Sequence, residues 1–187
     1  MSKTTEEIAK ELTEMAEYDL SVRERLLKAG ELEGGYHPEM ESVHRRNAAR
    51  LREIIAEIGW PTISMVGAEA SDAAWLIVQH SIGEPEFVRE CYGLIEDAAG
   101  EINPQNLAYL YDRICYFEGR PQRYGTQFDD VLYPVEDLNR VNELRNSVGM
   151  KPHPGDVLKK ARQVDTDGDL HQNDPELNEW RKQAGWI

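Results

Sequence analysis

The apolar residues of the first thirty positions recur every three or four residues, which predicts a long amphipathic helix from Thr4 to about Leu32. Thr4 or Thr5 precedes two glutamates and is the expected N-cap, and Gly30 is the first stop signal. The positions expected to be buried are Ile8, Leu12, Met15, Leu20, Leu26 and Leu27. A second helix is expected from Pro38 to Ile58, because proline is favoured in a first helical turn and Gly59 follows the last apolar residue.

Five further segments carry a helical pattern and are separated by short connectors. They are Ala68–His80, Pro85–Gly100, Asn103–Glu118, Glu136–Val148 and Pro154–Arg162, with an extended connector at Trp60–Ser64. Residues 120–135 have no helical period, and Thr126–Phe128 with Val131–Tyr133 are candidate hairpin strands. The sequence therefore predicts an all-α protein with a short irregular or β-hairpin insertion near residues 120–135.

The same pattern suggests three segments along the chain. Residues 1–35 form an N-terminal amphipathic helix, residues 36–162 a core helical domain, and residues 163–187 a polar C-terminal tail that contains Trp180 and Trp186. The core domain is expected to carry the functional site.

Charge and composition exclude several classes of protein. The 187 residues carry a net charge of −14, which argues against duplex nucleic acid or an anionic membrane as the main partner. No apolar run approaches the roughly 18–20 residues of a membrane span, and the first residues do not resemble a secretory signal. Cys91 and Cys115 form no metal-type pair, so both are expected to be reduced and the protein cytoplasmic, with no cofactor.

The basic residues are unevenly distributed. Every basic residue from position 43 to position 127 is an arginine. Arginine suits a partly buried contact with a carboxylate or a phosphate. These arginines either pair with the surplus glutamates of neighbouring helices or line an anion-binding cleft, for which Arg50 and Arg113 are the candidates.

Polar residues inside apolar helices are the candidates for chemistry. His80 ends an apolar helix, His44 borders the buried stripe of another, and Asp112 lies between two core residues. Each has a structural interpretation, as a helix cap, a core histidine or an interhelical salt bridge. The functional interpretation makes His80 a general acid or base that Asp112 orients, with His44 nearby.

The segment Gly119–Gln127 has an unusual composition, with glutamines, a tyrosine and almost no aliphatic residue after an apolar helix. Loops of this kind on a rigid scaffold often bind ligands. The expected substrate-binding residues are Arg113, Arg50, Gln79, Gln122, Tyr124 and Gln127.

Several of these segments resemble a widespread bacterial family of small domains of unknown function. The resemblance rests on Gln79-His80, on Ala108-Tyr109-Leu110-Tyr111-Asp112-Arg113 and on the segment Gly119–Gln127. It extends from about residue 36 to residue 158 and implies no activity. Within the chain it singles out His44, His80, Asp112, Arg113, Gln122, Tyr124 and Gln127.

Two metal sites are weaker alternatives. His44, His80 and Asp112 could form a site of two histidines and one carboxylate, which suits iron or zinc, but their spacing follows no metal motif. The segment Asp165–Glu176 partly matches a calcium loop, with Leu170 where glycine is needed. A solvated acidic turn is the favoured interpretation of that segment.

The favoured function is a small, metal-independent enzyme that performs acid–base chemistry on a small anionic or polar metabolite. Hydrolysis, elimination, isomerisation and cyclisation all remain open. One alternative is an acidic interaction module, such as an antidote for a basic toxin, for which the large negative charge would speed association. The other alternative is the enzyme with two histidines and one carboxylate on a metal.

Overall fold

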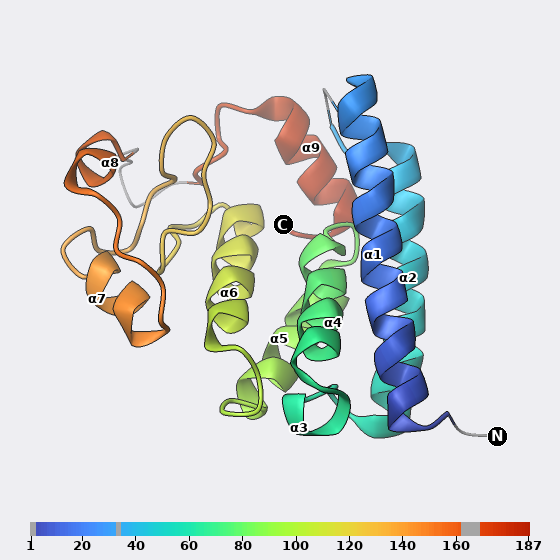
Figure 1. Ribbon diagram of the computed structural model, residues 1–187. Coiled ribbons are helices and arrows are strands. Elements are labelled where there is room, and N and C mark those ends of the chain that lie inside the picture. The colour runs from blue at the N-terminus through green and yellow to red at the C-terminus, as the bar shows by residue number, and fades with distance from the viewer. Residues whose placement is uncertain (1–2, 33–34, 162–168) are drawn as a thin grey trace. The chain divides into compact units, whose positions relative to one another are not determined.

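The structure, a computed structural model, describes residues 3–32, 35–161 and 169–187 and confirms the all-α prediction (Figure 1). Its helices are α1 (Thr5–Ala29), α2 (Pro38–Ile58), α3 (Ile63–Val66), α4 (Ala68–His80), α5 (Pro85–Asp97), α6 (Pro104–Glu118), α7 (Val141–Ser147), α8 (Gly155–Lys160) and α9 (Pro175–Ala184). The chain divides into two compact units, Met1–Asn103 and Pro104–Ile187. Each unit is described separately below.

Helix α1 begins and ends where its sequence signals predict. Thr4 accepts a hydrogen bond from the backbone N–H of Glu7 at 3.2 Å, and the Glu7 carboxylate accepts one from the Thr4 N–H at 2.8 Å. This reciprocal capping box satisfies two backbone donors that a helix start leaves unpaired. Gly30 ends the helix with a φ of 71°, a left-handed conformation that glycine adopts without strain.

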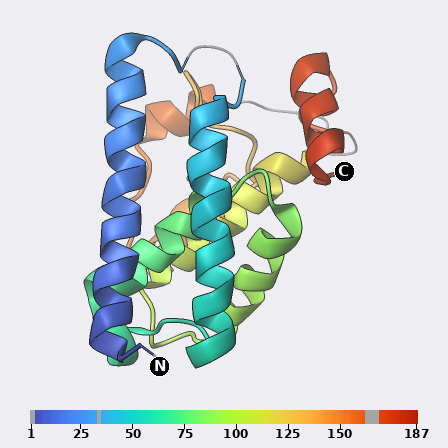
Figure 2. The same cartoon turned by 90° about the vertical axis from the view of Figure 1, so that its right-hand side faces the viewer.

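Helix α4 is the central element of the first unit. It packs against α1, α2, α3 and α5. Figure 2 shows the long helices α1 and α2 with α4 passing behind them. Every residue of α4 from Ala70 to His80 is buried or half-buried, as expected of a helix with neighbours on several sides. Its buried apolar residues are Ala70, Ala73, Ala74, Ile77 and Val78.

The buried stripe of α1 differs from the predicted one. Its buried residues are Ile8, Leu12, Ala16, Asp19, Val22 and Leu26. Leu20 and Leu27, which were expected in the core, are 47% and 58% exposed. The true stripe keeps a spacing of three or four residues only if it passes through Asp19, a charged residue that a search for apolar positions omits.

An ion pair joins α1 to α2. Arg50 on α2 donates from Nε and Nη2 to the two carboxylate oxygens of Glu11 on α1, at 2.7 and 3.0 Å. Its Nη1 also contacts Glu53 at 2.5 Å. The hydrogen bonds from Arg50, opposed by partial burial, lower the pKa of Glu11 to about 2. Arg50 therefore matches the structural interpretation of the arginines, a pairing with glutamates.

Two connectors differ from the expectation. The stretch expected to be extended at Trp60–Ser64 gives way at Ile63 to the single-turn helix α3, in which the N–H of Val66 donates to Thr62. The helix expected from Glu136 begins only at Val141. The Asp137 carboxylate accepts a hydrogen bond from the Asn139 N–H at 2.8 Å, and this local turn competes with the helix.

The second unit contains a helix that the sequence analysis missed. Helix α9 has Asp174 as N-cap, Pro175 in its first turn and a left-handed Gly185 at its end. Its Arg181 is completely buried and donates from Nε to the carbonyl of Phe117 on α6 at 2.6 Å. The guanidinium also binds Asp169 and Asn178, so the end of the chain is held against α6 by a buried cation.

We expect the Glu11–Arg50 pair to stabilise the first unit at neutral pH but not in acid. The pKa of Glu11 is lower in the folded state than in the unfolded state, so its contribution is present above about pH 4.5 and is lost as the pH falls toward 2. Glu11→Gln should lower the free energy of unfolding by about 1 kcal/mol at pH 7. Urea denaturation at pH 7 and pH 3 measures this, with exposed Glu14→Gln as the control. An equal loss at both pH values would contradict the assignment.

We expect Gly119→Ala to destabilise the second unit. Gly119 has a φ of +72°, and a Cβ there would lie 2.2 Å from Asp169 Oδ1 and 2.7 Å from Arg181 Nη2. The strained backbone alone costs about 1–2 kcal/mol, and the displaced ion pair adds to this cost. Gly155→Ala is the matched control, because no atom lies within 4 Å of its added methyl group. Thermal unfolding of both variants provides the measurement, and equal midpoints would show that α9 does not depend on this contact.

Candidate functional site

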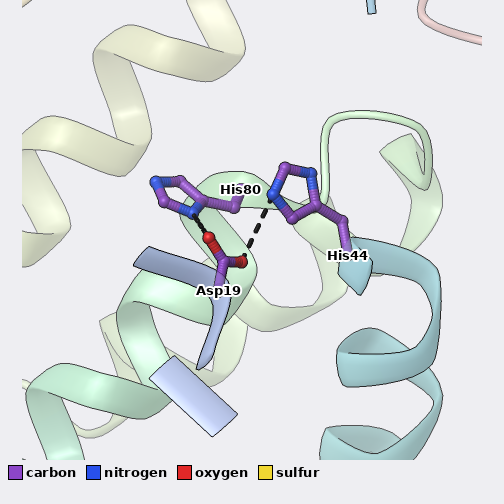
Figure 3. A group of neighbouring side chains, drawn as sticks. All are labelled: Asp19, His44 and His80. Atoms are coloured by element: carbon purple, nitrogen blue, oxygen red, sulfur yellow. Dashed lines mark hydrogen bonds and ion pairs between the residues drawn. The ribbon is translucent and has the colours of Figure 1, made fainter. Parts of the chain in front are cut away.

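Three polar side chains from three helices of the first unit meet in its interior (Figure 3). Asp19 comes from the middle of α1, His44 from the first half of α2 and His80 from the last position of α4. Asp19 is 1% exposed and His44 is 8% exposed, whereas the side chain of His80 is 18% exposed. The structure therefore brings His44 and His80 together, and it places beside them a carboxylate, Asp19, that was not among the predicted site residues.

Asp19 lies between the two imidazoles and uses a different oxygen for each. Oδ1 is 2.9 Å from Nδ1 of His80, and Oδ2 is 3.3 Å from Nε2 of His44. Burial raises the pKa of Asp19, but the two histidines outweigh this effect and lower it to about 2. The carboxylate is thus ionised at neutral pH although it is buried.

The two ring nitrogens of His44 differ in their contacts: Nδ1 has a hydrogen-bond partner, whereas Nε2 has only the ion-pair contact with Asp19. Its Nδ1 is 2.6 Å from the hydroxyl of Tyr36, whose ring stacks on the imidazole with centroids 5.6 Å apart. Its Nε2 is buried and has no hydrogen bond within the described part of the chain, because the contact with Asp19 is close but not aligned. A buried polar atom without a hydrogen bond costs about 1–3 kcal/mol, so this nitrogen requires an explanation.

The three side chains are suited to hold a metal ion. One ligand atom from each residue lies within 4.8 Å of the ligand atoms of the other two. Zinc and iron bind imidazole nitrogen and carboxylate oxygen at roughly 2.0–2.2 Å, which places neighbouring ligands about 3.3 Å apart in a tetrahedral site. The distance from His44 Nε2 to Asp19 Oδ2, 3.3 Å, equals this value, whereas the distance from His80 Nδ1 to Asp19 Oδ1, 2.9 Å, is that of a hydrogen bond.

Asp112, the carboxylate expected to orient His80, is engaged elsewhere, and the carboxylate bonded to His80 is Asp19. Asp112 belongs to the second unit, where it is buried on α6. Its oxygens accept hydrogen bonds from the backbone N–H groups of Arg123 at 2.7 Å, Tyr124 at 3.0 Å and Thr126 at 2.9 Å. Burial raises the pKa of Asp112, and these hydrogen bonds act in the opposite direction. Its visible role is to hold the loop that follows α6.

Gln122 holds the same loop from within. Its side-chain nitrogen donates to the carbonyls of Gln127 and Tyr133, both at 3.0 Å, and its oxygen accepts from the Gln127 N–H at 2.8 Å. The only strand-like pairing in the described insertion consists of isolated bridges, between Gln122 and Val135 and between Phe128 and Leu132. Side-chain hydrogen bonds therefore supplement the few backbone hydrogen bonds of this segment, such as those from Gln122 N–H to Pro134 and from Tyr133 N–H to Gln127.

The other expected binding residues are distributed over both units. The side chain of Gln127 donates to the Thr126 hydroxyl, and the ring of Tyr124 meets Tyr111 edge-on. The guanidinium of Arg113 lies over the ring of Phe117. Gln79 is buried next to His80, and its side-chain oxygen has no hydrogen bond among the described residues.

The remaining expectations concern the calcium segment, the cysteines and membrane spans. The suggested calcium segment includes residues 165–168, which lie outside the described residues. Cys91 and Cys115 are buried free thiols, and burial raises the pKa of Cys115 to about 12. A thiol with so high a pKa is a poor nucleophile.

None of the helices in the described parts of the chain has the length and apolar character that a membrane crossing requires.

The chain belongs to a protein family described as a family of unknown function (DUF6624), whose profile matches residues 6–161. This confirms the predicted resemblance to a family of unknown function and extends it to α1, which carries Asp19. The match ends before α9. No curated protein and no solved structure matches the chain significantly.

We expect Asp112→Asn to loosen the loop after α6. The amide replaces a charged acceptor by a weaker one and turns an NH₂ group toward backbone donors, which should cost about 2–4 kcal/mol. Amide hydrogen exchange at Arg123, Tyr124 and Thr126 should accelerate at least tenfold. Asp130→Asn, an exposed change in the same segment, is the control. Unchanged exchange at the three amides would contradict the role of Asp112.

Proposed function

We propose that this member of a family of unknown function is a metal-dependent enzyme with its centre at Asp19, His44 and His80. Two imidazoles and one carboxylate are a donor set that zinc and iron enzymes use. Three protein ligands leave coordination positions for water and for a substrate. A metal ion held by these residues would supply Lewis-acid and acid–base chemistry toward a small polar metabolite.

One observation carries this proposal, the buried Nε2 of His44. Its ring is fixed by Tyr36 on the other side, and Nε2 faces Asp19 at 3.3 Å without a hydrogen bond. If Nε2 carries a hydrogen, its partner is the poorly aligned Asp19 carboxylate at 3.3 Å; if it carries a lone pair, the lone pair faces an ionised carboxylate. A cation between the two groups removes the cost of both arrangements.

The ionisation state of Asp19 supports the same function. A carboxyl group binds a metal in its deprotonated form. Because the pKa of Asp19 is about 2, the group has already lost its proton at pH 7, and metal binding does not have to displace one. The position of the ligands on α1, α2 and α4 also supports it, since packed helices hold ligands with less entropy loss than loops do.

The proposed centre is compatible with all four reaction classes that the sequence leaves open. Hydrolysis, elimination, isomerisation and cyclisation all use a positioned base, which a metal ion held here would help to supply. The partial exposure of His80 marks the edge of the cluster from which solvent and a small molecule can approach.

A second candidate, metal-free acid–base catalysis by His80, is favoured by one specific contact. Nδ1 of His80 lies 2.9 Å from Asp19, and the second ring nitrogen points away from that carboxylate (Figure 3). A carboxylate that accepts the Nδ1 hydrogen orients the imidazole and leaves a lone pair on the outer nitrogen. In this alternative His80 is the base and His44 has a structural role.

Metal titration distinguishes the two candidates without knowledge of the substrate. Chelator-treated protein should bind one zinc or cobalt ion per chain in isothermal titration calorimetry. Asp19→Asn, His44→Ala and His80→Ala should each weaken binding at least 100-fold, because each removes one of three ligands. His37→Asn is the matched control, since it removes a nearby imidazole but keeps an N-cap acceptor for α2.

The wild-type protein alone can overturn the proposal. If the folded wild-type chain binds no zinc, cobalt or anaerobically added ferrous iron below millimolar concentration, the metal centre is wrong. Nitrogen-15 NMR of the His80 ring then tests the second candidate, which requires the hydrogen on Nδ1. Circular dichroism of each variant shows whether lost binding reflects lost folding.

A further inference from the structure

We infer that Tyr36 is a positioning residue of the metal centre, which fixes the hydrogen of His44 on Nδ1 and thereby leaves the Nε2 lone pair for the metal. The inference rests on the proposed function, because it assigns a role to Tyr36 toward a bound ion. It adds a fourth side chain, from outside the helices, to a centre otherwise built from α1, α2 and α4.

The geometry gives Tyr36 close control of one imidazole. Its hydroxyl oxygen is 2.6 Å from Nδ1 of His44. The two rings stack with an interplanar angle of 25° and centroids 5.6 Å apart. A hydrogen bond together with a stacking contact fixes both the tilt of the His44 ring and the direction of its Nδ1–Nε2 axis.

The chemistry of imidazole determines which atom donates. A neutral imidazole has one N–H group and one lone pair, and a metal takes the lone pair. When Nε2 binds the metal, the hydrogen is on Nδ1, which then donates to the Tyr36 oxygen. Metal-bound histidines commonly donate their other N–H to an oxygen in this way, which orients the ring and raises its basicity.

Contacts with neighbouring side chains hold the Tyr36 ring in place. It packs on an apolar cluster formed by Val22 and Leu26 of α1 and by Met40 and Val43 of α2. On another side lies Gly83, in the turn after His80, where an added Cβ would be 3.3 Å from the Tyr36 ring and 3.4 Å from the Arg45 guanidinium. The glycine thus lets the turn that follows one ligand approach the residue that orients another.

Tyr36→Phe tests the inference, because it removes the hydroxyl and keeps the stacked ring and the apolar packing. The variant should fold normally and still bind one zinc ion per chain, with a dissociation constant about 10–100 times higher. The reason is that Nδ1–H of His44 loses its acceptor in a buried position. Tyr18→Phe is the matched control, since Tyr18 precedes Asp19 on α1 and is 47% exposed.

A spectroscopic measurement separates positioning from general stability. In zinc-loaded wild-type protein, the Nδ1 hydrogen of His44 should give a slowly exchanging, downfield proton signal. Tyr36→Phe should shift or lose this signal, and should change the visible spectrum of the cobalt form, whereas Tyr18→Phe should change neither. A purely structural role for Tyr36 would leave both spectra unchanged.

The outcomes separate this inference from the function on which it rests. Absence of metal binding by the wild-type protein overturns the proposed function itself. Metal binding by the wild-type protein with equal affinity and an equal cobalt spectrum in Tyr36→Phe overturns only the role of Tyr36. A weakened, spectrally altered metal site in Tyr36→Phe, with Tyr18→Phe unchanged, supports both.

Discussion

A buried carboxylate that must remain paired is the constraint on which the first unit depends. Asp19 is 1% exposed, and an ionised group at such a position costs several kcal/mol unless partners surround it. Its partners come from two other helices, so the packing of α1, α2 and α4 must be in register at the level of individual atoms. Apolar side chains between helices can slide past one another at low cost, whereas a charge held by two imidazoles cannot. The polar contact therefore specifies one arrangement among those that the apolar core would allow.

The helices themselves were largely predictable because their signals are local. The capping box of α1, the proline that begins α2 and the full length of α4 all follow from residues within a few positions of each end. Asp19 was missed for an equally local reason. Because only apolar residues were considered, the predicted buried face of α1 included Leu20 and Leu27, which are exposed. Asp19 instead occupies the position that helical geometry assigns to the core. A charged residue at helical spacing within a buried stripe is the signal that would have found it.

The candidate site was predictable only in part, because polar residues in apolar helices have more than one cause. His44, His80 and Asp112 gave the same signal in the sequence. Two of them meet at Asp19, and the third binds the backbone of its own loop. No local pattern separates these outcomes, since their hydrogen-bond partners lie 8 to 61 residues away along the chain. The insertion after α6 was likewise located correctly but not explained, because its conformation depends on two side chains, Asp112 on α6 and Gln122 within the loop, whose hydrogen bonds follow no periodic pattern.

The way in which Asp112 holds that loop has a consequence for the residues that the loop can accept. Its partners at positions 123, 124 and 126 are main-chain N–H groups, which every amino acid except proline provides. These three contacts therefore exclude proline at positions 123, 124 and 126, and they fix the main chain without using the side chains of Arg123 and Tyr124. Gly125 adds a second constraint, because its φ is +65° and an added Cβ would lie 2.9 Å from Nε2 of His153. The path of the loop is thus set by one carboxylate and one glycine, while its Arg123 and Tyr124 side chains are left for other contacts.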